Sequence, residues 1–231
     1  ARGSVQNIEP FGVKLMGGFQ FRSEVGDSEA PRGYLSPGHN SAYYDAKAKK
    51  HFLITHTRFP NRGEQHSIRV HEMAPNADGW LVASPHRYVP IKGKNLVDAG
   101  DLPGDYKFID LGKDINRSAK ESVYISLHAD RTITGEVSGT YRRYLDEPSR
   151  ITIRLDGHET PFEGVLAWQW NEAAGKLVPV FSAVSRQGVS IWGSKLEKKT
   201  TAQALRDVAE ALSLPEAIKD GTLDLPGGSV S

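Results

Sequence analysis

The chain has 231 residues, of which 38% are hydrophobic, 9% aromatic and 25% charged, and this globular composition excludes a chain that is disordered throughout. Its 29 Lys and Arg residues nearly balance its 28 Asp and Glu residues, and the net charge of +1 predicts neither a nucleic-acid partner nor attraction to an anionic membrane. Cysteine is absent, which excludes disulfides and thiolate metal sites, and no apolar run reaches the ~20 residues of a membrane-spanning helix.

Short strand-like runs dominate the sequence. They comprise residues 52–57, 68–71, 123–127, 132–141, 151–155, 162–170, 177–184 and 189–196. Many of these runs alternate between apolar and polar residues, as Val123, Ile125 and Leu127 do, and this period indicates that one strand face is buried. The close spacing of short strands predicts an antiparallel barrel or sandwich over residues 105–197, with these three side chains pointing inward.

Turn-forming residues predict where the chain is divided. Residues 90–104 contain five Gly or Pro residues and little periodicity, which predicts a boundary between an upstream β segment and the downstream barrel. The upstream segment is too short for a comfortable core of its own. The Asp156-Gly157 pair predicts a hairpin with a type I′ turn, because that turn requires positive φ at both central positions.

The C-terminal region changes character after residue 197. Thr201 can cap a helix over residues 202–212, which Pro215 ends. The apolar residues of this segment are spaced at i, i+3, i+4 and i+7, so they form one stripe along the helix. A short C-terminal helix is therefore predicted, and its stripe is most simply explained by packing.

Eight histidines raise the question of a metal site, and their spacing bears on it. His51 and His56 are five residues apart, and so are His66 and His71. Residues an odd number apart on a strand point to opposite faces, so neither pair forms a local two-ligand site. We expect these four histidines at polar surface or strand-end positions.

His39 has a different context, because it directly follows the Pro37-Gly38 turn and precedes a run of small and aromatic residues. A histidine offered by a glycine turn at the mouth of a strand can reach a central cavity. Composition alone favours a structural role for it. The sequence also lacks the G-x-S-x-G, P-loop, G-x-G-x-x-G and H-E-x-x-H motifs, which weakens the serine hydrolase, NTPase, Rossmann and zincin interpretations.

The four tryptophans allow two interpretations. Trp80, Trp168, Trp170 and Trp192 could stack on sugar rings, and Trp168 and Trp170 are two residues apart, hence on the same strand face. The alternative is that they fill the barrel interior or cover one of its ends. Packing of this kind is the more common role of large aromatic side chains.

Several ordered motifs resemble glycoside hydrolase family 43. Residues 36–45 (SPGHNSAYYD), 50–59, 69–73 and 78–82 look like the end of its catalytic domain, and residues 104–109, 120–125, 133–140 and 188–194 look like the β-barrel that follows. The resemblance runs from about residue 10 to 197 and is strongest to two-domain bacterial endo-α-1,5-L-arabinanases. It implies an all-β chain: the last portion of a five-bladed β-propeller, an ancillary antiparallel barrel or sandwich, and a short C-terminal helix.

The resemblance also implies how the activity is divided. The family cleaves by inversion, with an Asp as general base, a Glu as general acid and a second Asp that orients the acid, and the base and acid lie about 6.5–9.5 Å apart. In the family these carboxylates lie on earlier blades, upstream of the S-P-G-H-N motif, so none of them is expected in this chain. We therefore expect the chain to be inactive alone and to require the N-terminal half of the same catalytic domain as its partner.

Two site residues follow from the resemblance. The histidine of the family's G-H-N motif lies at the channel centre beside a hydrated calcium ion or another cation, and it corresponds to His39. Because calcium prefers oxygen ligands, water would supply most of its shell. His39 would support catalysis by acting on the nearby carboxylates, and Asn40 would contribute to substrate binding.

The predicted organisation is a propeller portion in residues 1–92, an ancillary barrel in residues 93–197, and a linker helix with the start of an Ig-like module in residues 198–231. The predicted function is cleavage of plant cell-wall arabinan by a secreted or cell-surface bacterial enzyme. The alternative is a non-catalytic carbohydrate-binding or lipocalin-like β module, and co-purification of a second polypeptide that carries the missing blades would discriminate between them.

Overall fold

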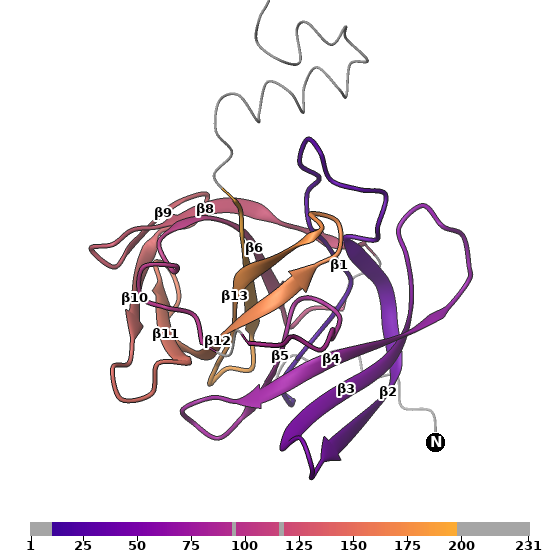
Figure 1. Cartoon of the computed structure of the whole chain (residues 1–231), viewed down its shortest axis with the longest axis horizontal. Helices are drawn as coiled ribbons and strands as arrows, with labels where there is room; N and C mark the ends of the chain where they lie inside the picture. The colour runs from indigo at the N-terminus through magenta and orange to yellow at the C-terminus, as the bar shows by residue number, and fades with distance from the viewer. Residues whose placement is uncertain (1–10, 94–95, 116–117, 198–231) are drawn as a thin grey trace, which may run out of the picture.

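The computed structural model describes residues 11–93, 96–115 and 118–197, which form strands and loops (Figure 1). In chain order the strands are β1 (Phe19–Gln20), β2 (Gly33–Asp45), β3 (Lys50–Arg58), β4 (Ser67–Pro75), β5 (Leu81–Ala83), β6 (Gly104–Gly112), β7 (Lys120–Glu121), β8 (Val123–Leu127), β9 (Thr132–Gly135), β10 (Gly139–Arg143), β11 (Arg150–Leu155), β12 (Phe162–Asn171), β13 (Lys176–Ser185) and β14 (Ser190–Lys195). Within the described ranges no helix has the length and apolar character needed to cross a membrane. The helix expected over residues 202–212 and the module expected within residues 198–231 lie outside the described residues.

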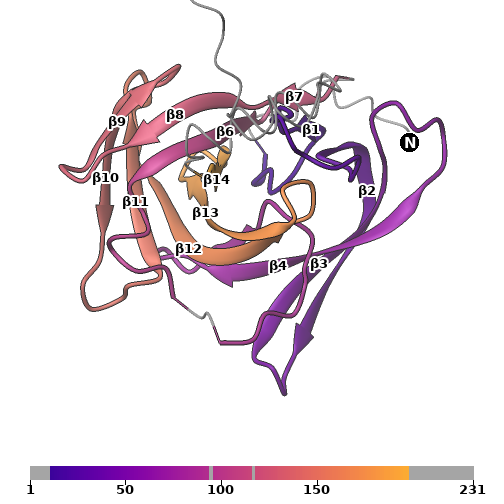
Figure 2. The same ribbon diagram turned by 45° about the horizontal axis from the view of Figure 1, so that its top comes forward.

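The strands form a six-stranded sheet and a closed barrel, which lie side by side (Figures 1 and 2). The sheet has the order β5-β4-β3-β2-β1-β7. Its strands β2 to β5 follow one another in sequence and pair antiparallel, whereas β1 and β7 pair in parallel. Because β7 lies between two barrel strands in sequence, it joins the sheet to the chain segment that builds the barrel.

The barrel has the strand order β10-β11-β12-β13-β14-β6-β8-β9 and closes between β9 and β10. Apart from β7, which joins the other sheet, its strands pair in chain order, which makes it an up-and-down barrel without an unpaired edge. Large apolar side chains fill its interior, among them Tyr106, Phe162 and Phe181. Ile125 and Leu127 belong to this core and Val123 packs against it, which confirms the predicted inward face.

Two details of the barrel differ from the sequence prediction. Residues 132–141 form two strands, β9 and β10, because the chain turns between Gly135 and Gly139. A Cβ at Gly139 would lie 2.0 Å from the carbonyl oxygen of Arg154, so only glycine permits this close approach of β10 to β11. The hairpin predicted at Asp156-Gly157 is confirmed, because β11 and β12 pair antiparallel, but its type I′ turn is wrong. Residues 156–161 join the two strands, and only Gly157 of the predicted pair has positive φ.

The apolar core of the sheet is completed by the outer surface of the barrel. Phe19, Tyr34 and Met73 from the sheet pack with Leu111 and Trp192 from the barrel in one buried cluster. The rings of Phe19 and Trp192 meet edge to face, with their centroids 5.0 Å apart. Burial of each such side chain stabilises the fold by about 1.5–3 kcal/mol. The upstream β segment is therefore stabilised by the barrel, a contact that the sequence analysis did not predict.

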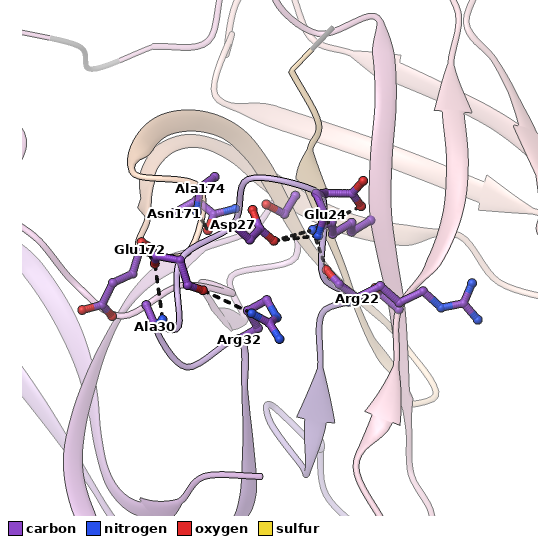
Figure 3. A network of polar contacts seen from close by, with 12 residues as sticks. Arg22, Glu24, Asp27, Ala30, Arg32, Asn171, Glu172 and Ala174 are labelled. Carbon is purple, nitrogen blue, oxygen red and sulfur yellow. Dashed lines mark hydrogen bonds and ion pairs between the residues drawn. The ribbon is translucent and has the colours of Figure 1, made fainter. Parts of the chain in front are cut away.

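Polar contacts also hold the loop between β1 and β2 against the barrel (Figure 3). The ammonium group of Lys107, on β6, is almost fully buried and donates to the carbonyl oxygen of Arg22 at 2.6 Å. Carboxylate oxygens of Glu24 and Asp27 lie 3.4 and 3.6 Å from the same nitrogen. A buried charge needs such partners, so this cluster fixes the loop that leads into β2.

Candidate functional site

The candidate site begins at an irregular stretch of β2. The pairing of β2 with β3 shifts register on both sides of Gly38, and Ser36 and His39 have φ values of 49° and 42°. Positive φ at a non-glycine residue costs about 1–2 kcal/mol, and such strain and bulges occur often where a side chain is re-aimed at a functional site. His39 therefore leaves the regular alternation of the strand.

Two buried threonines of β3 hold this irregular stretch in place. The hydroxyl of Thr55 donates to the carbonyl oxygen of Gly38 at 2.7 Å, and that of Thr57 donates to the carbonyl oxygen of Leu35 at 3.0 Å. Carbonyl groups that the shifted ladder leaves without a regular partner are thereby satisfied. The strained conformation at His39 is consequently supported by the neighbouring strand.

Three histidines meet at this position. The Nδ1 atoms of His39 and His56 lie 3.2 Å apart, and the ring centroids of His56 and His66 lie 4.6 Å apart. His39 and His66 are exposed, and His56 is half-buried. Partial desolvation, and then the neighbouring imidazoles of His39 and His66, lower the pKa of His56 below its usual range. These three residues are called the histidine cluster below.

The odd histidine spacing correctly predicts that His51 and His56 lie apart, but it does not predict this cluster. His51 lies beside Tyr44, away from His56, as the odd spacing predicts. The antiparallel hairpin of β3 and β4 brings His66 back to His56, and β2 adds His39 on the other side of β3. A prediction of strand pairing, rather than of single strands, would have found it.

His71 does not fit the predicted surface or strand-end position, because it is fully buried. Its Nδ1 atom donates to the carbonyl oxygen of Ser84 at 2.7 Å, so its Nε2 atom accepts from the hydroxyl of Tyr34 at 3.1 Å. Burial lowers the pKa of His71 to about 4. The neutral imidazole is therefore a structural group beneath the sheet.

The charged groups beside the histidine cluster form an ion pair. Arg58 pairs with the carboxylate of Glu64 and donates to the hydroxyl of Ser36 at 3.1 Å. Asn40 is exposed next to His39. In the described part of the chain no group of three His, Asp or Glu side chains could hold a metal ion by itself. This chain thus offers imidazole nitrogens to a cation and leaves the rest of a coordination shell to other groups.

The outer side of β2 and part of one face of the sheet are uncovered in the described part of the chain, although Phe52 on that face packs against Tyr88. Beyond its first two residues, β2 pairs with β3 alone. The face that carries His56 also carries Tyr43, Ile54 and Ile68, and the side chains of Tyr43 and Ile68 are 55% and 64% exposed. We call these three apolar residues the open face. An unpaired strand edge beside an exposed apolar patch is typical of a surface that another polypeptide covers.

Comparison with known proteins gives consistent matches. The family GH43_C, described as a C-terminal lipocalin-like domain, matches residues 85–193. The extracellular endo-α-(1→5)-L-arabinanase 2 of Bacillus subtilis is 45% identical over 192 residues, which are 82% of this chain and 39% of that protein. The extracellular endo-α-(1→5)-L-arabinanase of Thermotoga petrophila is 41% identical over 198 residues, which are 85% of this chain and 41% of that protein.

Solved structures agree with the sequence matches. The family 43 glycoside hydrolase YxiA from Bacillus licheniformis aligns with a TM-score of 0.74 and 44% identity, covering 83% of this chain and 41% of that one. The endo-1,5-α-L-arabinanase of Thermotoga petrophila aligns with a TM-score of 0.75 and 40% identity, covering 82% of this chain and 42% of that one. The chain spans about two fifths of the length of the proteins it matches. The chain thus matches the C-terminal part of family 43 glycoside hydrolases.

Proposed function

We propose that this chain is the C-terminal part of an inverting glycoside hydrolase that cleaves α-1,5-L-arabinofuranosidic bonds of plant cell-wall arabinan. The catalytic carboxylates would be supplied by an N-terminal half of the same catalytic domain. The observation that carries this proposal is the histidine cluster beside an uncovered strand edge and the open face. The match to named arabinanases supports the substrate, and their description as extracellular supports a secreted or cell-surface location.

The sheet fits the last blade of a β-propeller. Strands β2 to β5 form a four-stranded antiparallel meander in sequence order, which is the repeating unit of propellers. A blade in a propeller is covered on both faces, yet the open face of this one has no partner in the described part of the chain. We propose that residues 1–92 belong to the catalytic propeller and residues 93–197 to the ancillary barrel.

His39 is proposed to act on the reaction through positioning and electrostatics. The innermost strand of a propeller blade faces the channel, and β2 has the unpaired edge that this position requires. There the neutral imidazole of His39 would face a cation and orient the water around it, while Asn40 would bond a substrate hydroxyl. Proton transfer to and from the glycosidic oxygen would stay with the carboxylates of the N-terminal half.

The cation at His39 is proposed to be calcium or another ion held mostly through water. Two imidazole nitrogens 3.2 Å apart have the separation of two ligands on one ion, since metal–nitrogen bonds of about 2.0–2.1 Å at a tetrahedral angle give roughly this spacing. Calcium prefers oxygen, so the imidazoles themselves suit a transition ion better. A bound cation would supply positive charge near the reacting sugar.

Cation binding can be tested on this chain alone by calorimetric titration. We expect Zn²⁺ to bind to the chain. His39→Ala and His56→Ala should each weaken that binding by about tenfold or more, because each variant removes one of the two imidazole ligands. His158→Ala is the matched control, since His158 is exposed and lies in the loop between β11 and β12. Equal Zn²⁺ affinity of all three variants would contradict a cation site at His39.

The proposed partnership can be tested by association. We expect the chain to form a 1:1 complex with the missing N-terminal segment of its own polypeptide in size-exclusion chromatography. Ile68→Asp should weaken the complex by about tenfold or more, because it places a charge on the open face. Leu145→Asp is the matched control, because Leu145 is 93% exposed in the loop between β10 and β11. A chain that stays monomeric in the presence of that segment would overturn the proposal.

A further inference from the structure

Two tryptophans of β12 border a pair of neighbouring hollows far from the histidine cluster. Trp170 and Trp168 line a hollow of about 110 Å³, and Trp168 also lines the next hollow, of about 380 Å³. Both side chains are half-buried, and as alternate residues of one strand they project from the same face roughly 6.6 Å apart. The two hollows have Trp168 in common, and we call them together the tryptophan groove.

Most of the charged residues that border the tryptophan groove form ion pairs. Beside the smaller hollow, Lys50 bonds the carboxylate of Glu72 at 2.8 Å, and Arg87 makes two bonds of 2.7 Å to Glu172. Beside the larger hollow, Lys176 pairs with Glu197. Apolar side chains such as Leu177 and Val178 also line the larger hollow. The charges around the groove nearly cancel, so it offers little attraction to a polyanion such as nucleic acid. Ion pairs next to aromatic faces offer donors and acceptors to hydroxyl groups.

Packing at the end of the barrel accounts for the position of Trp168 but not for that of Trp170. Trp168 packs against the barrel core, and its indole nitrogen donates to the carbonyl oxygen of Leu96 at 2.9 Å, so it partly covers one end of the barrel. Trp170 belongs to none of the apolar clusters among the described residues. A large ring that is half-exposed, lines a hollow and contributes to no core is available to a ligand.

We propose that the tryptophan groove is a second saccharide-binding site, which takes a neutral arabino-oligosaccharide with Trp170 as its main stacking platform. The identity of the sugar rests on the proposed function, whereas the saccharide class rests on the rings and the balanced ion pairs. Lys50 and His56 stand six residues apart on β3, so the groove lies roughly 20 Å from the histidine cluster. A polymer bound there is held on the protein without occupying the proposed channel.

The groove is tested by titrating the full 231-residue chain with linear α-1,5-arabinohexaose in a calorimeter. We expect binding at millimolar or lower sugar concentration, and Trp170→Ala should weaken it by about tenfold or more, because central aromatic contacts dominate such interfaces. Trp80→Ala is the matched control, since Trp80 is 59% exposed in the turn between β4 and β5 and touches neither hollow. Thermal unfolding of each variant shows that it remains folded.

Two further measurements separate the outcomes. Added salt should leave hexaose affinity unchanged, and polygalacturonate should not compete, because no counterions are released from a neutral ligand. Hexaose binding that Trp170→Ala leaves intact, or no binding by the wild-type chain, would overturn the groove. If Trp170 is needed for hexaose binding but the chain never supports arabinan cleavage with an N-terminal half, the proposed function fails and the groove stands. If the chain supports arabinan cleavage with an N-terminal half but Trp170→Ala leaves hexaose affinity unchanged, the groove fails and the proposed function stands.

Discussion

Purified alone, the 231-residue chain is expected to release no measurable reducing ends from linear arabinan. Inverting hydrolysis needs a general acid and a general base about 6.5–9.5 Å apart with a water between the base and the sugar. The carboxylate of Glu64 beside the histidine cluster is held in an ion pair by Arg58. General acid and general base catalysis each contribute about 10²–10⁴ in rate, so without both groups the rate should fall by at least about four orders of magnitude.

Addition of the N-terminal half should restore the activity. The role of His39 in that activity can then be tested by replacing it. In the assembled enzyme we expect His39→Ala to lower kcat by about 10–100-fold, as the loss of a group that orients metal-bound water does. The unfolding temperature should change little, because His39 is exposed and alanine keeps the Cβ atom that is strained at positive φ. Ser36→Ala is the matched control, since Ser36 shares the irregular stretch and the positive φ but carries no imidazole.

The opposite pattern would contradict this role for His39. A structural histidine would lower the unfolding temperature when it is replaced and leave the turnover of the folded fraction unchanged. Arabinan cleavage by the 231-residue chain alone, at the rate of a full-length family member, would show that the carboxylates lie within it. Kinetics and thermal melts on the same protein samples distinguish these results.

Local patterns allowed most of the barrel to be predicted. The strand-like runs located β8, β11, β12 and β13 to within about one residue at each end. Most of these strands alternate because one face is buried in the closed barrel, whereas β13 is buried on both faces. The separation of β9 from β10 was missed, since the sequence between Gly135 and Gly139 keeps its strand-like alternation and the turn depends on close approach to β11. The cluster shared by Phe19 and Trp192 joins residues far apart in sequence, so no local pattern reveals it.

The candidate site was predictable only in part, for the same physical reason. His39 stood out because of the Pro37-Gly38 pair before it and the family motif around it, and its role stays a prediction. The turn predicted at that pair is wrong, because both residues lie in an irregular stretch of β2. His56 and His66 could not be recognised from spacing on one strand, because they meet across a hairpin. The strain at His39 and its support by Thr55 depend on the register shifts of β2, which arise from pairing rather than from composition.

Stability of the fold is expected to fall steeply as the pH drops from about 6.5 to 4, because two histidines are held neutral. Desolvation lowers the pKa of His71 to about 4 and that of His86 to about 3, whereas both would titrate near 6.5 in the unfolded chain. Above pH 6.5 His71 and His86 bind no proton in either the folded or the unfolded state, so they do not change the free energy of unfolding there. Below it only the unfolded state gains protons, so each histidine costs up to ~1.4 kcal/mol per pH unit until its native pKa is reached.

Urea unfolding at a series of pH values tests this expectation, with His71→Gln as the decisive variant. Glutamine can donate to the carbonyl oxygen of Ser84 and accept from the hydroxyl of Tyr34 but does not titrate, so the pH dependence between 6.5 and 4 should lose about one proton of slope. His158→Gln is the control and should keep the full slope, because His158 is exposed to solvent before unfolding as well as after. The lowered pKa of Glu172, held down by Arg87, places the loss of that ion pair at more acidic pH. An unchanged slope in His71→Gln would mean that the buried imidazole is already protonated in the native state.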